Sequence, residues 1–158
     1  MAPGLRERIS GRGILIAVAV VVVAFGIMQL VPYRVSNSSV RREPPWDSRR
    51  TRALAKTVCF DCHSNQTETY WWEDVAPVSW WITKHVNDGR KALNLSECTR
   101  KGGESGDAAE TVRNRSMPPD YYTWLGLHAS AQLTGQQRRQ LADGLRRSLS
   151  GAGCGGGG

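Results

Sequence analysis

Two cysteines and a histidine in the run Cys59-Phe60-Asp61-Cys62-His63 constrain this chain more than any other feature. At this spacing two thiols can add to the two vinyl groups of one porphyrin, and the adjacent imidazole then falls beside the iron. The motif therefore predicts one covalently attached haem c. Cys59 and Cys62 are the expected attachment residues, and His63 is the expected proximal iron ligand.

Cys-x-x-Cys without the histidine also occurs in dithiol redox proteins and in zinc sites. A thioredoxin-like pair follows a strand, whereas the helix-favouring stretch Arg49 to Val58 leads into this motif. A zinc site needs a second pair of ligands at matching spacing. The remaining cysteines and histidines are isolated, so haem attachment is the favoured interpretation; they are Cys98, Cys154, His85 and His128.

The N-terminal part of the chain is basic and then apolar. Residues 14–31 form an eighteen-residue run in which Gln29 is the only strongly polar member. A helix of that length reaches about 27 Å, close to the thickness of the bilayer hydrocarbon. Arg6, Arg8 and Arg12 precede the run and no arginine interrupts it. This predicts an uncleaved transmembrane signal anchor with a cytoplasmic N-terminus. A cleaved secretory signal is the alternative, although no small-x-small cleavage site follows.

Both interpretations export the rest of the chain. The net charge is +7, and 18 basic and 13 acidic residues follow the membrane segment. A basic exported domain predicts redox partner proteins with acidic docking surfaces, or anionic lipid head groups, and its location excludes nucleic acid. An oxidising compartment permits Cys98 and Cys154 to pair. Because Cys154 lies in a glycine-rich tail, a disulfide and a free thiol both remain open.

Composition divides the chain into five segments. The 158 residues allow one modest domain with an extension. The expected segments are a cytoplasmic basic tail (1–13), a transmembrane signal anchor (14–33), a linker stiffened by two prolines (34–48), a cytochrome c-like haem-binding domain (49–150) and a glycine-rich tail (151–158).

The sequence after the membrane segment predicts helices only, because it contains no run of alternating apolar residues that would indicate a sheet. One short helix over 49–58 delivers Cys59. A second opens at Asp74 or Pro77 and is expected to end at Gly89. A glycine-rich loop, Gly102 to Gly106, precedes a short helix from Asp107 to Asn114. Two apolar stripes are expected to be buried: Val78, Trp81, Ile82, His85 and Val86 in the second helix, and Leu141, Leu145 and Leu149 in a last helix opened by the capping box Thr134/Gln137. The predicted fold class is a small all-α domain wrapped on a cofactor.

A second axial ligand is expected at Met117. Two prolines follow it in Met117-Pro118-Pro119, and such a turn can hold a thioether in place without an ordering cost at binding. His/Met ligation raises the reduction potential, which suits an electron shuttle. An ordinary packing role is the alternative for Met117. His85 is the alternative ligand, because its stripe position turns it inward. The expected haem-pocket residues are Trp80, Trp81, His85, Arg90, Tyr121, Tyr122 and His128.

Five ordered blocks together resemble the bacterial haem-binding domain family, which is related to class I cytochromes c. The blocks are Cys59-Phe-Asp-Cys-His-Ser-Asn-Gln-Thr, Ala76-Pro-Val-Ser-Trp-Trp, His85-Val-Asn-Asp-Gly-Arg90, Asn94-Leu-Ser and Met117-Pro-Pro-Asp-Tyr-Tyr. The resemblance runs from about Arg49 to Leu149. It implies a single covalently bound haem and matches Met117 to the family's methionine-proline element. It implies a fold and a cofactor rather than a pathway.

The expected function is that of a membrane-anchored monohaem c-type cytochrome that transfers single electrons outside the cytoplasmic membrane, within or beside a respiratory chain. No substrate-transforming constellation is visible, so an electron carrier is expected rather than an enzyme. A haem sensor or peroxidase-like protein is one alternative and needs a labile sixth ligand. A haem-containing structural or assembly subunit of a respiratory complex is another.

Overall fold

The computed structural model describes residues 11–98, 107–126 and 128–154, and within them it contains helices and no strand. The all-α prediction is therefore confirmed. The elements are α1 (Gly11–Met28), α2 (Arg49–Val58), α3 (Phe60–His63), η1 (Trp71–Asp74), α4 (Val78–Ala92), α5 (Asp107–Arg113), η2 (Asp120–Gly126), η3 (Ala129–Ala131) and α6 (Gly135–Leu149). Three sequence predictions lie outside the described residues: Arg6 and Arg8 of the basic tail, the Gly102–Gly106 loop, and the tail residues 155–158.

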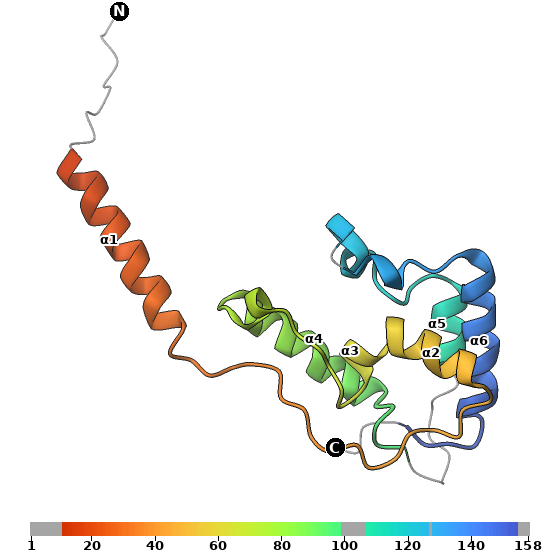
Figure 1. Ribbon diagram of the computed structural model, residues 1–158. Helices are drawn as coiled ribbons and strands as arrows, with labels where there is room; N and C mark the ends of the chain where they lie inside the picture. The colour runs from red at the N-terminus through yellow and green to blue at the C-terminus, as the bar shows by residue number, and fades with distance from the viewer. Residues whose placement is uncertain (1–10, 99–106, 127, 155–158) are drawn as a thin grey trace, which may run out of the picture.

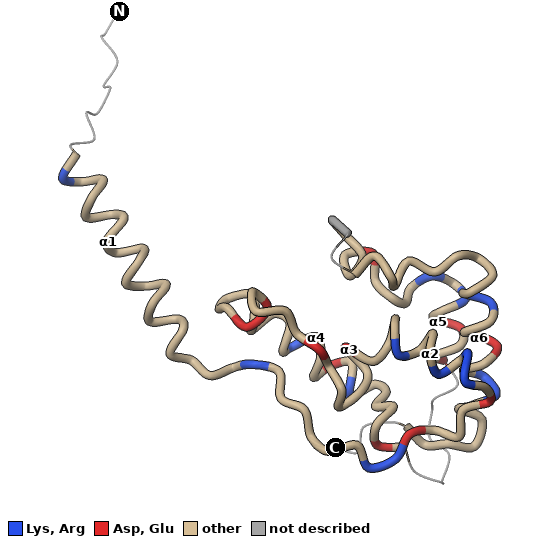
Figure 2. Tube along the Cα trace, in the orientation of Figure 1, with Lys and Arg blue, Asp and Glu red and all other residues tan. Residues whose placement is uncertain are grey.

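Helix α1 stands apart from the helical domain (Figure 1). It buries none of its residues, and by length and composition it can cross a membrane, a test that a signal sequence also passes. No charged residue lies between Arg12 and Arg34 (Figure 2). The helix begins and ends three residues before the predicted run 14–31. Pro32 disfavours helical backbone at the residue before it, and α1 ends short of that point.

The core surrounds α6, which packs against α2 and against α5 at one side of the domain (Figure 1). The predicted last helix is confirmed: the Thr134 hydroxyl accepts from the Gln137 amide, and the Gln137 side chain accepts from the Thr134 amide. The leucine stripe of α6 is buried as predicted, at Leu141, Leu145 and Leu149. Helix α2 meets it with Leu54 and Val58, also buried.

Helices α2 and α6 approach closely at Gly144. A β-carbon added there would clash with the Thr51 hydroxyl oxygen and would lie 2.5 Å from its methyl carbon. The Thr51 hydroxyl is itself held by the hydroxyl of Ser48, which caps α2. The absence of a side chain at Gly144 therefore sets the distance between the two helices.

The segment 34–48, expected as a linker, lies along the domain and bonds to it. The amides of Arg41 and Arg42 donate to the Ser96 carbonyl, and the Arg42 carbonyl accepts from the Cys98 amide. Arg52 of α2 donates twice to the Glu43 carboxylate, each at 2.6 Å. These bonds join the segment to two separate parts of the helical domain.

The tail residues that the structure describes are packed as well. Cys154 is fully buried and forms a disulfide with Cys98. Its carbonyl accepts a 2.7 Å hydrogen bond from the Asn94 amide. The choice between a free thiol and a disulfide, open from the sequence, is thus resolved in favour of the disulfide.

Helix α4 departs from the prediction at its end and along its face. It runs through Gly89 to Ala92, so the expected termination at Gly89 is wrong. It buries Ser79, Thr83 and Val86, whereas Val78 and Trp81 of the expected buried stripe are 39% and 51% exposed. Gly89 lies inside the helix because α4 packs closely against the Cys-x-x-Cys-His motif at that residue.

We expect Gly144→Ala to lower the free energy of unfolding by about 1–3 kcal/mol, because the added methyl group must push Thr51 away. Gly135→Ala is the matched control, since a β-carbon there meets only the far end of the Arg139 side chain, at 3.7 Å. Urea unfolding of both variants measures the difference. Equal stability of the two variants would contradict the close approach of α2 and α6.

Candidate haem site

The Cys-x-x-Cys-His motif occupies the junction of α2 and α3. Cys59 ends α2, where its amide donates to the Ala55 carbonyl, and it also precedes the first residue of α3. Phe60 is buried in the core and fixes the start of α3, so that Cys62 and His63 follow within its single turn. Neither Cys59 nor Cys62 is in a disulfide.

Helix α4 packs directly on this turn, which explains the glycine inside it. A β-carbon at Gly89 would lie 2.5 Å from the carbonyl oxygen of Cys62. This is a steric clash, and a backbone atom cannot move away from it without disturbing the helix. Gly89 therefore allows α4 to touch the backbone of the motif. Figure 1 shows α3 and α4 side by side.

The end of α4 also orients the histidine. His63 Nδ1 lies 3.1 Å from the carbonyl oxygen of Leu93, the residue that follows α4. Burial lowers the pKa of His63, with the carbonyls of Leu93 and Gly89 acting in the opposite direction. A neutral imidazole that donates from Nδ1 keeps its lone pair on Nε2, and such a backbone hydrogen bond typically orients a metal-ligating histidine.

The two thiols are protonated at neutral pH. Burial raises the pKa of Cys59 to about 12, helped by the neighbouring Cys62, and burial with nearby Asp61 raises the pKa of Cys62 to about 11. A dithiol redox protein needs the opposite shift, since the thiolate is its nucleophile. Among the described residues, no three His, Cys, Asp or Glu side chains gather as a metal site. Both rival uses of the motif lose support.

One apolar cavity of about 230 Å³ brings the predicted attachment residues and Met117 together. Its lining comes from the motif, the end of α4, α5, the methionine-proline turn and α6. The lining residues are Val58, Cys59, Cys62, His63, Ala92, Leu93, Asp107, Ala108, Thr111, Val112, Met117, Pro118, Pro119, Tyr122, Leu141 and Leu145.

Arg138 fixes the methionine-proline turn. Its guanidinium Nη1 donates to the carbonyl of Val112, at the end of α5, and to the carbonyl of Met117, at 2.9 and 3.1 Å. The Met117 amide donates to the Thr111 carbonyl at 3.0 Å. Sequence reasoning could not single out Arg138, because an arginine on an amphipathic helix is ordinarily solvated and this contact joins distant segments.

Tyr122 lies between this cavity and an adjoining hollow of about 170 Å³. The cavity and the hollow also have Cys62 and Pro119 in common as lining residues. Its hydroxyl donates to the Asp61 carboxylate at 2.5 Å, and its ring stacks on His128 with centroids 4.0 Å apart. Burial and the Asp61 hydrogen bond raise the pKa of Tyr122. Tyr122 is thus fixed at the wall of the predicted pocket.

His85 and His128 line the adjoining hollow rather than the cavity that contains His63. His85 Nδ1 contacts the Trp81 carbonyl at 2.8 Å, and its ring packs against Trp81 and Tyr121. Met117 therefore shares the cavity with His63, and the alternative ligand His85 does not.

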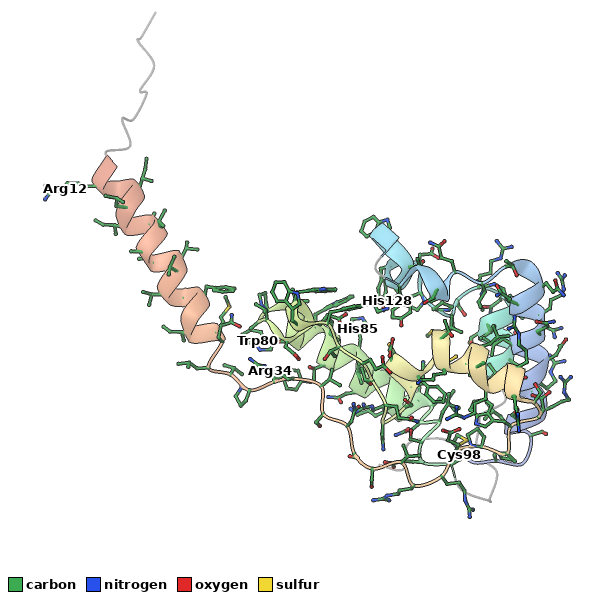
Figure 3. All side chains as sticks on the ribbon, viewed as in Figure 1. Arg12, Arg34, Trp80, His85, Cys98 and His128 are labelled. Atoms are coloured by element: carbon green, nitrogen blue, oxygen red, sulfur yellow. A yellow bond between two sulfur atoms is a disulfide. The ribbon has the colours of Figure 1, made fainter. Side chains whose placement is uncertain are left out.

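Arg90 and Trp80 lie elsewhere. The Arg90 guanidinium donates to four oxygens of the protein, those of Ser64, Ser36, Asn37 and Thr67. It ties the segment before α2 to the motif. Trp80 lines a surface hollow beside Tyr33, away from the cavity (Figure 3).

The cavity fits a porphyrin by its chemistry. Its surface is mostly apolar, its two thiols and imidazole stand on one turn, and a thioether lies on a separate turn. Sulfur and imidazole are common axial donors to haem iron. The fold and the site together define a small helical haem-binding domain.

The family comparison agrees with this definition. The family model described as a haem-binding domain matches residues 23–147, and the chain belongs to that family. The match starts well before Arg49, so it includes the end of α1 and the segment 34–48 that bonds to the domain. Searches of curated proteins and of solved structures gave no significant match.

We expect Arg138→Leu to loosen the methionine-proline turn, because two carbonyls lose their donor. Hydrogen exchange at the Met117 amide should then speed by roughly tenfold, equivalent to about 1.4 kcal/mol for the lost bonds. Arg139→Leu removes the same charge from the neighbouring exposed position and should leave the exchange unchanged. Equal protection of the Met117 amide in the two variants would contradict the role of Arg138.

Proposed function

We propose that this protein is a membrane-anchored monohaem c-type cytochrome that carries single electrons on the extracytoplasmic side of the membrane. The observation that carries the proposal is the single cavity shared by Cys59, Cys62, His63 and Met117. Bound there, a haem supplies an iron that cycles between the ferrous and ferric states.

Cys59 and Cys62 are the proposed attachment residues. Each thiol would add across one vinyl double bond: sulfur bonds to one carbon, the thiol hydrogen passes to the other, and no oxidant is required. Their raised pKa values keep that hydrogen on sulfur at neutral pH. The turn of α3 holds both sulfurs at the wall of one cavity.

His63 and Met117 would supply a nitrogen and a sulfur ligand to the iron. The Leu93 carbonyl holds His63 through Nδ1, which leaves Nε2 for the iron. Arg138 and Thr111 hold the backbone of Met117, so little ordering is needed to present its thioether. A His/Met pair raises the reduction potential and suits an electron carrier rather than an enzyme.

Helix α1 is the proposed anchor. The arginine at its start and the uncharged length after it orient the N-terminus toward the cytoplasm. Anchoring would keep the haem domain close to the bilayer and raise its effective concentration near membrane-bound partners. The basic exterior of α6 would meet the acidic docking surface of a redox partner protein; its exposed arginines include Arg139 and Arg146.

A haem sensor or peroxidase-like protein is the second candidate, favoured by one observation. Met117 is 39% exposed, so this side of the cavity is open to solvent. A ligand that detaches readily would then admit small molecules to the iron.

Carbon monoxide separates the two candidates. We expect the reduced full-length haem protein to bind carbon monoxide slowly, because Met117 would supply a competing sulfur ligand to the iron. We expect Met117→Ala to bind it at least tenfold faster. Met28→Ala, in α1, is the matched control and should behave as the parent protein. Rapid binding by the parent protein at neutral pH would favour the sensor over the carrier.

Electron transfer itself has a direct readout in membranes. A respiratory substrate should reduce the haem of the full-length protein within seconds, and oxygen should re-oxidise it. Visible absorption of membrane vesicles measures both steps. A haem that responds to neither addition, but does respond to a chemical reductant, would contradict the carrier role.

A further inference from the structure

Two tryptophans are exposed to an unusual degree. Trp71 of η1 is 81% exposed and Trp124 of η2 is 72% exposed, the largest values among the tryptophans. Neither lines the haem cavity or the adjoining hollow. Indole rings left in water forgo a large burial free energy, so their exposure calls for a partner that covers them.

The two tryptophans belong to one surface. Tyr70, beside Trp71, packs on His128, which follows η2, with ring centroids 5.8 Å apart. Trp81 of α4 contacts Tyr121 of η2 edge-on at 5.3 Å. Exposed apolar side chains thus extend across η1, the start of α4 and η2. We call this set the aromatic surface: Trp71, Val78, Trp81, Tyr121 and Trp124, each at least 39% exposed.

A pair of hydrogen bonds ties this surface to the end of α1. The Gln29 side-chain nitrogen donates to the Ala76 carbonyl at 3.1 Å, and the Ala76 amide donates to the Gln29 side-chain oxygen at 3.0 Å. Gln29 directly follows α1, and Ala76 is buried between η1 and α4. Gln29 therefore acts as a clamp between the apolar helix and the elements that carry Trp71 and Val78.

The arrangement in space agrees with this clamp. Figure 1 shows η1 and the start of α4 on the side of the domain nearest the end of α1, with α5 and α6 on the far side. If α1 crosses a bilayer, the aromatic surface lies at the level where the helix leaves it. The basic exterior of α6 then faces away from the membrane.

We propose that the aromatic surface rests in the interfacial layer of the lipid bilayer, with Trp71 and Trp124 at the level of the head groups. The inference rests on the membrane anchoring under the proposed function. Tryptophan and tyrosine favour this layer because one part of the ring is apolar and the other bonds to water.

Lipid is favoured over a protein partner by proximity and by charge. The clamp holds the surface beside the bilayer continuously, so its effective concentration at the interface exceeds that of any diffusing partner. Asp74 of η1 and Asp120 of η2 stand in the same short helices as Trp71 and Trp124, and the five residues of the surface carry no positive charge. Burial of aromatic rings, rather than attraction to anionic lipid, therefore drives the contact, and zwitterionic lipid suffices.

Spin labels at single positions test the proposal in the full-length haem protein. Trp71→Cys and Trp124→Cys each receive a nitroxide, and the protein is reconstituted into phosphatidylcholine vesicles. Gln140→Cys, on the exposed face of α6, is the matched control. The parent protein should take up no label, because Cys98 and Cys154 are in a disulfide and thioethers would occupy Cys59 and Cys62. Label uptake by the parent protein would count against the proposed haem attachment instead.

At positions 71 and 124 we expect oxygen to relax the label more than a water-soluble nickel chelate does, and at position 140 the reverse. Labels at 71 and 124 that behave like the label at 140 would overturn the proposal. Shielding that develops only when other membrane proteins are added would also overturn it, in favour of a protein partner. Loss of the chain from vesicles in an alkaline wash would instead disprove the anchor.

The clamp has its own test. Gln29→Leu keeps the apolar length of the segment and removes both bonds to Ala76. Combined with Trp71→Cys, it should raise access of the nickel chelate to the label severalfold, while the visible spectrum of the haem stays unchanged. An unchanged label environment would contradict the role of Gln29 in placing the surface.

Discussion

The structure depends on the contact between the turn of α3 and the last turn of α4. Gly89 lets the backbones of α3 and α4 meet at the Cys62 carbonyl. The carbonyl of Leu93, four residues after Gly89, accepts a hydrogen bond from Nδ1 of His63. One turn of one helix therefore fixes a wall of the cavity and the orientation of its imidazole. The opposite wall forms independently, where Leu141 and Leu145 of α6 bury against α2 and α5. The cavity therefore lies between the contact of α3 with α4 on one side and the packing of α6 against α2 and α5 on the other.

The sequence predicted the parts of this arrangement that local chemistry determines. The capping box at Thr134 and the leucine spacing of α6 specify a helix and its buried face without reference to the rest of the chain. The haem attachment that the motif predicts stays a prediction, and the structure places its two cysteines and its histidine at the wall of one cavity. Gly89 shows where local rules fail: glycine usually ends a helix, but here it sits inside one because another backbone needs the space. The predicted burial of the apolar stripe of α4 was wrong for Val78 and Trp81, because these side chains line a hollow instead of the core.

Long-range contacts account for what the sequence could not reveal. The segment 34–48 reads as a linker because of its prolines and polar residues, and only the partners at Ser96 and Arg52 show that it is bound. Arg138 reads as a surface arginine until the carbonyls of Val112 and Met117 are placed beside it. The family match, which begins at residue 23, agrees with the view that this N-terminal segment is part of the domain.

The account as a whole depends on covalent haem at Cys59 and Cys62, and intact-mass spectrometry after acid-acetone extraction tests it most directly. The full-length protein, produced with haem c maturation machinery, should retain the mass of one haem. The Cys59→Ser/Cys62→Ser variant should lose it, and Cys98→Ser/Cys154→Ser, which removes the disulfide, should retain it. A parent chain with the unmodified mass, its haem wholly in the extract, would contradict the account.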